Sequence, residues 1–132
     1  MWENCGVLRE ESKLKDGLNK INILKDSIEH LDVRPDSEGF EDLMLAFDLE
    51  GSIMSAEATI LGAIERKESR GAHQRNDYSE ISQDMSANFN IKLNNSNDLE
   101  VDKVDLKKMS NELSEIINNT QSITDFSGML LE

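Results

Sequence analysis

Residues 40–70 carry two apolar stripes at helical spacing, and this segment restricts the possible folds more than any other. Two stripes widen the buried arc of a helix, so the segment is predicted to be a long central helix that ends near Gly71. The first stripe is Leu43, Phe47, Met54, Ala58 and Leu61, and the second is Ala46, Leu49, Ile53, Ala56, Ile60, Ala63 and Ile64. Glycine inside a helix costs about 1 kcal/mol relative to alanine, so Gly51 and Gly62 predict close packing against this helix.

A second helix is predicted over residues 11–31, because one apolar stripe recurs there at three- and four-residue steps. Its members are Leu14, Leu18, Ile21, Leu24, Ile28 and Leu31. Pro35 and Gly39 fall in the stretch between the two helices and predict a connector rather than continued helix. The two segments are therefore expected to form a helical hairpin, preceded by a short N-terminal stub.

The apolar period changes from helical to alternating over residues 87–104. Phe89, Ile91 and Leu93 alternate with polar residues, a polar turn follows at 94–98, and Leu99 and Val101 alternate again. This pattern predicts a β-hairpin with a five-residue loop. Helical spacing returns at 105–118, with Asp105 as the expected N-cap. The predicted fold is mainly α: a helical hairpin resembling a three-helix bundle or spectrin repeat, a small β-hairpin and a C-terminal helix.

Composition excludes several classes of protein. The net charge is −13, with 27 acidic against 14 basic residues, which argues against nucleic-acid binding. No run of about 18 apolar residues predicts a membrane span, and no basic and apolar leader precedes the first helix. The single cysteine, Cys5, suits a reducing compartment. Scattered glycines, two histidines and one cysteine give neither a dinucleotide or phosphate loop nor a metal pattern, so no cofactor-binding or metal-ligating residue is expected in this chain.

Residues 65–78 concentrate basic and bifunctional side chains in an otherwise acidic chain, and they form the candidate site. Its members are Glu68, Arg70, His73, Arg75, Asp77 and Tyr78. A catalytic interpretation uses His73 as acid or base and the two arginines as a dicarboxylate clamp. A small hydrolase or lyase built on Glu68, His73 and Asp77 is a variant of it. The favoured interpretation is structural: the cluster ties a helix end to a neighbouring surface, between domains or subunits, and no residue is catalytic.

Four blocks of the sequence resemble one family of flavoproteins. Residues 1–9 are similar to M-W-x-x-x-G-I/V-x-R, and 14–18 to L-x-x-A/G-L. Residues 42–49 and 56–58 resemble D-L-x-x-A-x-x-L followed by A-E-A, and 68–78 match E-S-R-G-A-H-x-R-x-D-Y. These blocks resemble the C-terminal helical region of succinate dehydrogenase and fumarate reductase flavoprotein subunits. Aspartate oxidases share part of the last block but usually lack arginine at the position of Arg75, which makes their C-terminal domain an alternative.

The resemblance implies a role for the whole chain. It would be the C-terminal domain of a larger enzyme that interconverts succinate and fumarate, with FAD bound elsewhere in the polypeptide. Its partners would be the FAD-binding domain and the iron–sulfur subunit, in the cytoplasm, with membrane association only through partner subunits. Residues 1–80 would be the family domain and 81–132 an extension. Trp2, with little before it to pack against, suggests a fragment that self-associates when isolated. The competing hypothesis is a free-standing acidic helical interaction module.

Overall fold

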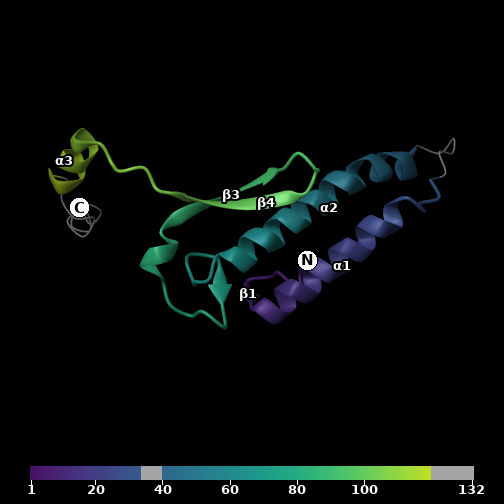
Figure 1. Ribbon diagram of the computed structural model, residues 1–132, viewed down its shortest axis with the longest axis horizontal. Coiled ribbons are helices and arrows are strands. Elements are labelled where there is room, and N and C mark those ends of the chain that lie inside the picture. Colours follow the sequence, from purple (N-terminus) through teal and green to yellow (C-terminus); the bar gives the residue numbers. More distant parts are fainter. Residues whose placement is uncertain (34–39, 120–132) are drawn as a thin grey trace, which may run out of the picture.

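The computed structural model describes residues 1–33 and 40–119, and within these ranges the predicted fold class is confirmed. Two long helices lie side by side, a two-stranded β-hairpin runs along the second of them, and a short helix follows beyond the hairpin (Figure 1). The predicted connector at Pro35 and the end of the chain from residue 120 lie outside the described residues. The division into residues 1–80 and 81–132 stays a prediction.

The helix pair consists of α1 (Glu11–Ile28) and α2 (Glu41–Glu65), which pack against each other along one face. Leu14 and Ile21 of α1 meet Ile53, Ile60 and Ala63 of α2 in the core. The chain before α1 closes one end of this core with Cys5. Gly17 allows the close approach, because a Cβ there would lie 2.9 Å from Asn4 Cβ and 3.2 Å from Ile60 Cδ1.

Only one of the two predicted stripes of α2 is largely buried within this chain. Ile53, Ile60 and Ala63 of the second stripe are buried, whereas Phe47 and Met54 of the first are 77% and 37% exposed. The helix also ends at Glu65, five residues before the predicted limit, and Arg66 is already extended. The predicted stop at Gly71 was wrong. Gly71 has φ +58° and lies in the turn between Arg70 and His73, which form an isolated bridge.

The β-hairpin has the predicted position and loop length. β3 (Ala87–Leu93) pairs antiparallel with β4 (Leu99–Asp105), from Ala87 opposite Asp105 to Leu93 opposite Leu99. Both strands contact α2, and Ile91 covers Gly62 so closely that a Cβ there would lie 3.2 Å from Ile91 Cδ1. The close packing predicted at Gly62 is therefore confirmed, and the hairpin supplies it.

The last described helix, α3 (Asn111–Asn119), starts later than predicted. Asp105 is the final residue of β4 rather than an N-cap, because the strand pairing with Ala87 extends that far. Ser110 takes the capping role, and its Oγ accepts a hydrogen bond from Leu113 N at 3.3 Å. A turn of 3-10 helix, η1 (Gln83–Met85), precedes the hairpin. In Figure 1, α3 lies beyond the hairpin and away from the helix pair.

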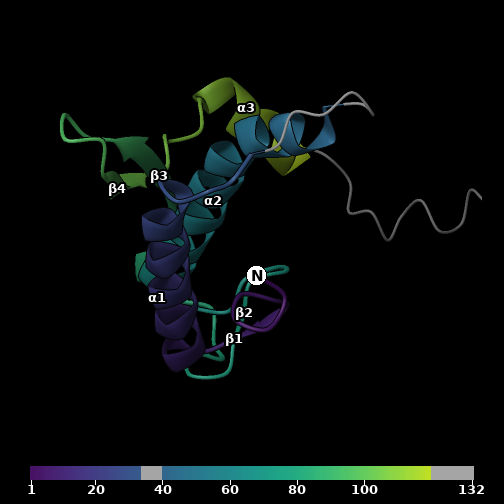
Figure 2. The same ribbon diagram turned by 90° about the vertical axis from the view of Figure 1, so that its right-hand side faces the viewer.

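A short parallel sheet joins the stretch before α1 to the segment that follows α2. β1 (Leu8–Arg9) pairs with β2 (Gln74–Arg75), with Leu8 opposite Gln74 and Arg9 opposite Arg75. Figure 2 shows this sheet beside the start of α1. The pairing brings the chain that leaves α2 back to the N-terminus of α1. It thereby places the charged segment 66–78 where the two helix ends meet.

Candidate functional site

Arg75 is the centre of the charged cluster, and it is only 2% exposed. Its Nε and Nη2 donate to the two carboxylate oxygens of Asp77 at 2.7 and 2.6 Å, which is the bidentate geometry of a strong ion pair. Its Nη1 donates to Ala63 O at 2.7 Å and to Ile64 O at 3.5 Å. These are carbonyls of the last turn of α2, which have no partner inside the helix. The guanidinium therefore caps the C-terminus of α2, where the helix dipole favours a cation.

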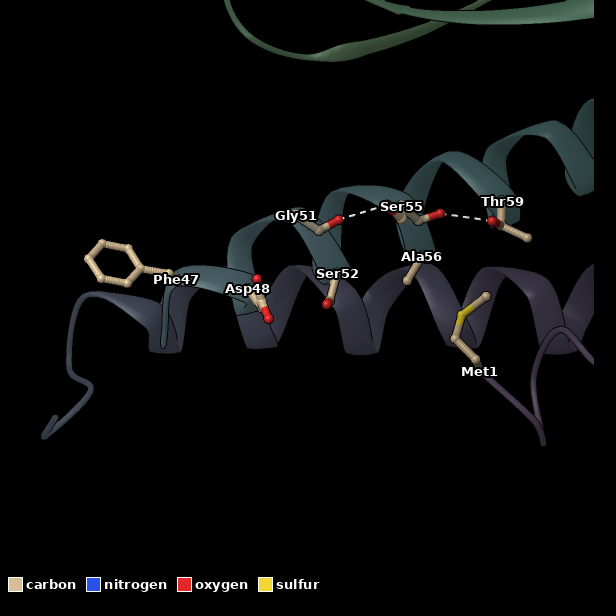
Figure 3. A pocket seen from close by; sticks show the side chains of 8 residues that line it. All are labelled: Met1, Phe47, Asp48, Gly51, Ser52, Ser55, Ala56 and Thr59. Atoms are coloured by element: carbon tan, nitrogen blue, oxygen red, sulfur yellow. Dashed lines mark hydrogen bonds between the residues drawn. The ribbon is translucent and has the colours of Figure 1, made fainter. Parts of the chain in front are cut away.

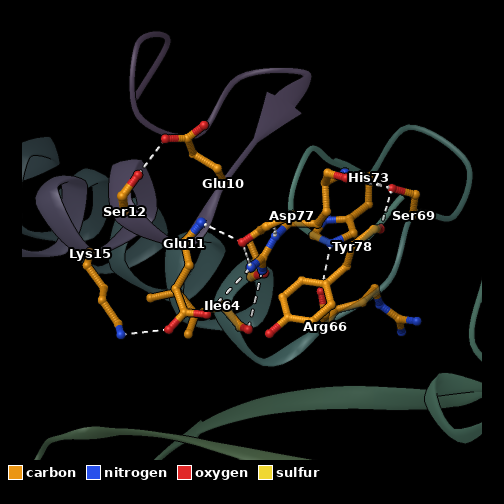
Figure 4. A network of polar contacts seen from close by, with 12 residues as sticks. Glu10, Glu11, Ser12, Lys15, Ile64, Arg66, Ser69, His73, Asp77 and Tyr78 are labelled. Atoms are coloured by element: carbon orange, nitrogen blue, oxygen red, sulfur yellow. Dashed lines mark hydrogen bonds and ion pairs between the residues drawn. The ribbon is translucent and has the colours of Figure 1, made fainter. Parts of the chain in front are cut away.

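Asp77 performs the complementary task at the other helix. Its Oδ2 accepts a hydrogen bond of 2.9 Å from Glu11 N, the first residue of α1 (Figure 4). The residue before it, Glu10, makes no side-chain cap, so Asp77 replaces a local N-cap from 66 positions away. The hydrogen bonds from Arg75 hold the pKa of Asp77 below its ordinary value. One ion pair thus joins the end of α2 to the start of α1.

Glu68, which is fully buried, organises a second ion cluster. Arg70 donates to its two oxygens at 2.9 and 3.1 Å, Arg66 donates to Oε1 at 2.5 Å, and Ser82 N donates to Oε2 at 3.0 Å. The Arg70 hydrogen bonds outweigh burial and, with those from Ser82 and Arg66, lower the pKa of Glu68 to about 2. A carboxylate with four donors is a satisfied structural group.

Arg66 extends this cluster to the β-hairpin. Its guanidinium donates to Met85 O at 3.1 Å and Ala87 O at 2.8 Å, and it stacks over Phe89 with its carbon 4.5 Å from the ring centroid. Because Ala87 is the first residue of β3, Arg66 fixes where the hairpin leaves the helix pair. Neither Arg66 nor Ser69 was among the predicted site residues. The buried Ser69 hydroxyl receives a hydrogen bond from Arg75 N at 2.8 Å and donates to Tyr78 O at 2.8 Å.

His73 is held in one tautomer by its two neighbours. Its Nε2 lies 2.9 Å from Arg66 O, which can only accept, so this nitrogen carries the proton. Its Nδ1 then accepts from Arg9 Nη1 at 2.7 Å. Burial and the nearby charges of Arg9, Arg75 and Arg66 lower the pKa of His73 against the opposing hydrogen bond to Arg66 O. The neutral imidazole therefore links the side chain of Arg9 to the backbone of Arg66 through two hydrogen bonds.

The six predicted site residues lie in one region but form separate structural units. Glu68 and Arg70 belong to one ion cluster, Arg75 and Asp77 to the other, and Tyr78 packs under Arg75 with its ring centroid 4.9 Å away. Their assignment to an interface between domains or subunits stays a prediction. Arg70 and Tyr78 remain partly exposed and could contribute to one, whereas Glu68 and Arg75 are buried within this chain.

The geometry does not support the catalytic interpretations. A clamp for a dicarboxylate needs free guanidinium donors, and those of Arg70 and Arg75 are engaged by Glu68 and Asp77. An acid–base site on Glu68, His73 and Asp77 fails because both carboxylates are neutralised by arginines. No group of side chains in residues 1–33 and 40–119 could hold a metal ion. Arg66, Arg70 and Arg75 do not fit a flavin pyrophosphate either, since each is paired with a carboxylate and no glycine-rich loop accompanies them.

An open groove runs along α2 from Phe47 to Thr59, with Met1 of the stretch before α1 beside it (Figure 3), and none of its lining residues belongs to the charged cluster. It has a volume of about 710 Å³, and small side chains form its floor. Gly51, Ser52, Ser55 and Ala56 line it, with Phe47 at one end. A Cβ on Gly51 would meet no atom within 4 Å. The close packing predicted at Gly51 is therefore not supplied by the described part of this chain. No helix in that part is long and apolar enough to cross a membrane.

Comparison with known proteins identifies the family of the chain. The model of the family described as fumarate reductase flavoprotein C-terminus matches residues 1–122. A fumarate reductase flavoprotein subunit from Haemophilus influenzae is 38% identical over 81 residues, which cover 61% of this chain and 14% of that protein. An FAD-dependent oxidoreductase from Methanocaldococcus jannaschii is 35% identical over 92 residues, 70% of this chain and 16% of that protein.

The fold comparison agrees. A quinol fumarate reductase from E. coli superposes with a TM-score of 0.75 at 24% identity, over 83% of this chain and 20% of that one. An L-aspartate oxidase from Acinetobacter baylyi is related at 29% identity over 101 residues, but the succinate and fumarate flavoproteins fit better. The matched segment thus spans 14–16% of the length of the two relatives described above. It belongs to the fumarate reductase flavoprotein C-terminal family and corresponds to the C-terminal domain of a succinate dehydrogenase or fumarate reductase flavoprotein subunit.

Proposed function

We propose that the chain acts as the non-catalytic C-terminal domain of an FAD-dependent enzyme that interconverts succinate and fumarate. In this role it packs on the FAD-binding domain of the same polypeptide and contributes to the surface that meets an iron–sulfur subunit. The observation that carries the proposal is the family match over residues 1–122 in a chain that spans only 14–16% of the two relatives described. The chemistry of such an enzyme then belongs to the rest of the flavoprotein.

The distribution of side chains supports a docking role. Trp2 is 85% exposed, Phe47 77%, Leu45 67% and Met44 64%. Phe47, Leu45 and Met44 gather near the start of α2, and large apolar residues exposed in one region typically mark a surface that another protein covers. The groove at Gly51 belongs to the same side of α2 as Phe47, so a partner could approach the helix backbone closely there. The charged cluster, in contrast, stabilises the domain that presents this surface.

The direct test is reconstitution from two pieces. The flavin-binding part of the flavoprotein is produced without this segment, and its association with the 132-residue chain is measured by calorimetry or sedimentation. We expect a stable complex whose flavin absorbance and succinate-dependent dye reduction come from the larger piece. Dye reduction or bound flavin in the 132-residue chain alone would contradict the proposal, as would failure of the two pieces to associate.

Variants of the charged cluster separate assembly from chemistry. Arg70→Ala and Arg75→Ala are expected to reduce the fraction of assembled enzyme, while turnover per assembled flavin stays nearly unchanged. The assembled fraction of each variant is purified before its rate is measured. A fall in turnover of about 100-fold or more with normal assembly would be the size expected for losing an electrostatic catalytic group, and would show that the cluster is catalytic.

A further inference from the structure

Arg9 differs from the other arginines of the charged region. Arg66 and Arg70 are paired with Glu68, and Arg75 is paired with Asp77. Arg9 donates instead to two neutral acceptors, Gly6 O at 2.8 Å and His73 Nδ1 at 2.7 Å. None of the ion pairs in residues 1–33 and 40–119 includes it. Its positive charge is therefore held in a fixed place without a compensating carboxylate from the described part of the chain.

The neighbours of Arg9 orient it without neutralising it. His73 is neutral and accepts one Nη1 hydrogen bond, and the carbonyl of Gly6 takes the Nε hydrogen. The backbone of Arg9 is fixed too, because Arg9 O accepts from Asn76 N at 2.8 Å within the β1–β2 pairing. Such anchoring removes much of the conformational entropy that a free arginine loses on binding. The second amino group, Nη2, has no protein partner in the described residues.

A hollow of about 460 Å³ opens beside this guanidinium. Arg9, Arg66 and His73 line it, together with Asn88 and Asn90 of β3. No aspartate or glutamate lines it, although the whole chain carries a net charge of −13. Val7 and Leu8, immediately before Arg9, are 60% and 65% exposed. An anchored arginine beside exposed apolar side chains is typical of a protein–protein interface.

We propose that Arg9 receives a single carboxylate side chain from the flavin-binding part of the same flavoprotein, which docks over the hollow between β1 and β3. The inference rests on the function proposed above and adds the chemistry of one contact. Among the described residues that line the hollow, Arg9 is the cation without a carboxylate partner, since Arg66 is paired with Glu68 and also donates to Met85 O and Ala87 O. A single cation can pair with a single carboxylate. The side-chain amides of Asn88 and Asn90 can donate further hydrogen bonds to that carboxylate. A free dicarboxylate would require a second free cation.

The two-piece reconstitution tests this contact. Arg9→Gln in the 132-residue chain should weaken its binding to the flavin-binding part by about 30-fold or more, as expected when one partner of a buried charge pair is truncated. Lys67→Gln is the matched control, because Lys67 is exposed and lies outside the hollow. Its affinity should change by less than about fivefold, the range of an exposed surface charge.

A second variant guards against misfolding, since Arg9→Gln also loses the hydrogen bonds to Gly6 and His73. Asn90→Asp changes an exposed residue and adds a carboxylate to the lining of the hollow that Arg9 also lines. It should leave the urea unfolding of the isolated chain nearly unchanged and still weaken docking by a similar factor. Normal affinity of both variants would overturn the inference while leaving the proposed function intact.

Two further outcomes are distinguishable. Saturable binding of succinate or acetate to the isolated chain below about 1 mM, a free energy near −4 kcal/mol, would identify a small-molecule site if Arg9→Gln abolished it, and would overturn the docking assignment. If the wild-type chain fails to bind the flavin-binding part at all, the proposed function fails and the inference fails with it.

Discussion

The two ends of the helix pair differ in how their side chains are covered. Charged groups are buried and paired at one end, and apolar side chains are exposed at the other. At the end where α2 stops and α1 begins, Arg75 and Glu68 are almost completely buried, and every charged group on them has a partner in this chain. Toward the start of α2, Phe40, Met44 and Phe47 are each more than half exposed. Gly51 beside them has no neighbour that would require a glycine. One end is closed by polar bonds, and the other leaves apolar surface uncovered.

A segment rich in charged side chains is usually interpreted as a functional site, and the contrast between the two ends indicates the opposite here. The segment richest in chemical groups is structural, because arginine and carboxylate side chains replace the glycine, proline or local caps that ordinarily end and start helices. The broad surface left for a partner at the start of α2 is apolar, and beside the charged cluster the contact proposed for a partner is that of Arg9. Burying an ion pair is favourable only when further hydrogen bonds complete it, and both carboxylates here meet that condition.

The largest expected effect is at the closed end. Arg75→Ala leaves Asp77 without its partner and the Ala63 carbonyl without a donor, so the free energy of unfolding of the isolated chain should fall by about 3–5 kcal/mol. Urea denaturation followed by circular dichroism measures it. Lys103→Ala, at an exposed position of β4, is the control and should stay within about 0.5 kcal/mol of wild type. A loss below about 1 kcal/mol for Arg75→Ala would mean that the pair contributes little to closure.

Lowering the pH should destabilise the same end of the helix pair. The folded-state pKa values of Glu68 and Asp77 lie below their ordinary values of 4.5 and 3.8, so their contribution is fully present above pH 4.5. It is lost as pH falls toward the folded-state values, about 2 for Glu68. Glu68→Gln should lower stability at neutral pH by about 1–3 kcal/mol and show a shallower acid loss. Glu65→Gln, at an exposed site, is the control. Parallel acid curves for Glu68→Gln and wild type would contradict the assignment.

Alanine substitutions at Gly17 and Gly51 compare how closely the chain is packed toward each end of the helix pair. Gly17→Ala places a methyl group 2.9 Å from Asn4 Cβ, so it should destabilise the chain by about 1–3 kcal/mol through overpacking. Gly51→Ala meets no atom within 4 Å and should stabilise the isolated chain by up to about 1 kcal/mol through helix propensity. Thermal unfolding of both variants gives the signs. If Gly51→Ala were destabilising in a verified monomer, the start of α2 would be more closely packed than the structure shows.

The smallest effect on stability is expected at the open end, where association should change instead. We expect the isolated chain to self-associate through exposed residues such as Phe47, and Phe47→Ser should reduce this association. Its free energy of unfolding, measured at low protein concentration, should stay within about 0.5 kcal/mol of wild type. Sedimentation velocity over a concentration series measures the association. A wild-type chain that stays monomeric throughout would rule out this behaviour.

Periodicity in the sequence predicted much of this fold, and its failures have a physical cause. Alternation placed both strands of the β-hairpin, because their half-buried faces follow a period of two. The end of α2 at Glu65 could not be predicted, since Arg75, which caps it, lies 11 and 12 positions after the carbonyls that it binds. The capping of α1 by Asp77 spans 66 positions and leaves no local signal. Pattern also located the charged cluster, but only the fold shows that its charges are paired internally.

The pairing of Arg75 with Asp77 is the most direct test of the closed end. A double-mutant cycle uses Arg75→Ala, Asp77→Ala and the double variant, each measured by urea denaturation at a concentration where the chain is monomeric. Because the two side chains share a bidentate ion pair and cap opposite helices, we predict a coupling energy of about 2–3 kcal/mol. Additivity within about 0.5 kcal/mol would contradict an internal clamp and return the charged cluster to the role of a surface for partners.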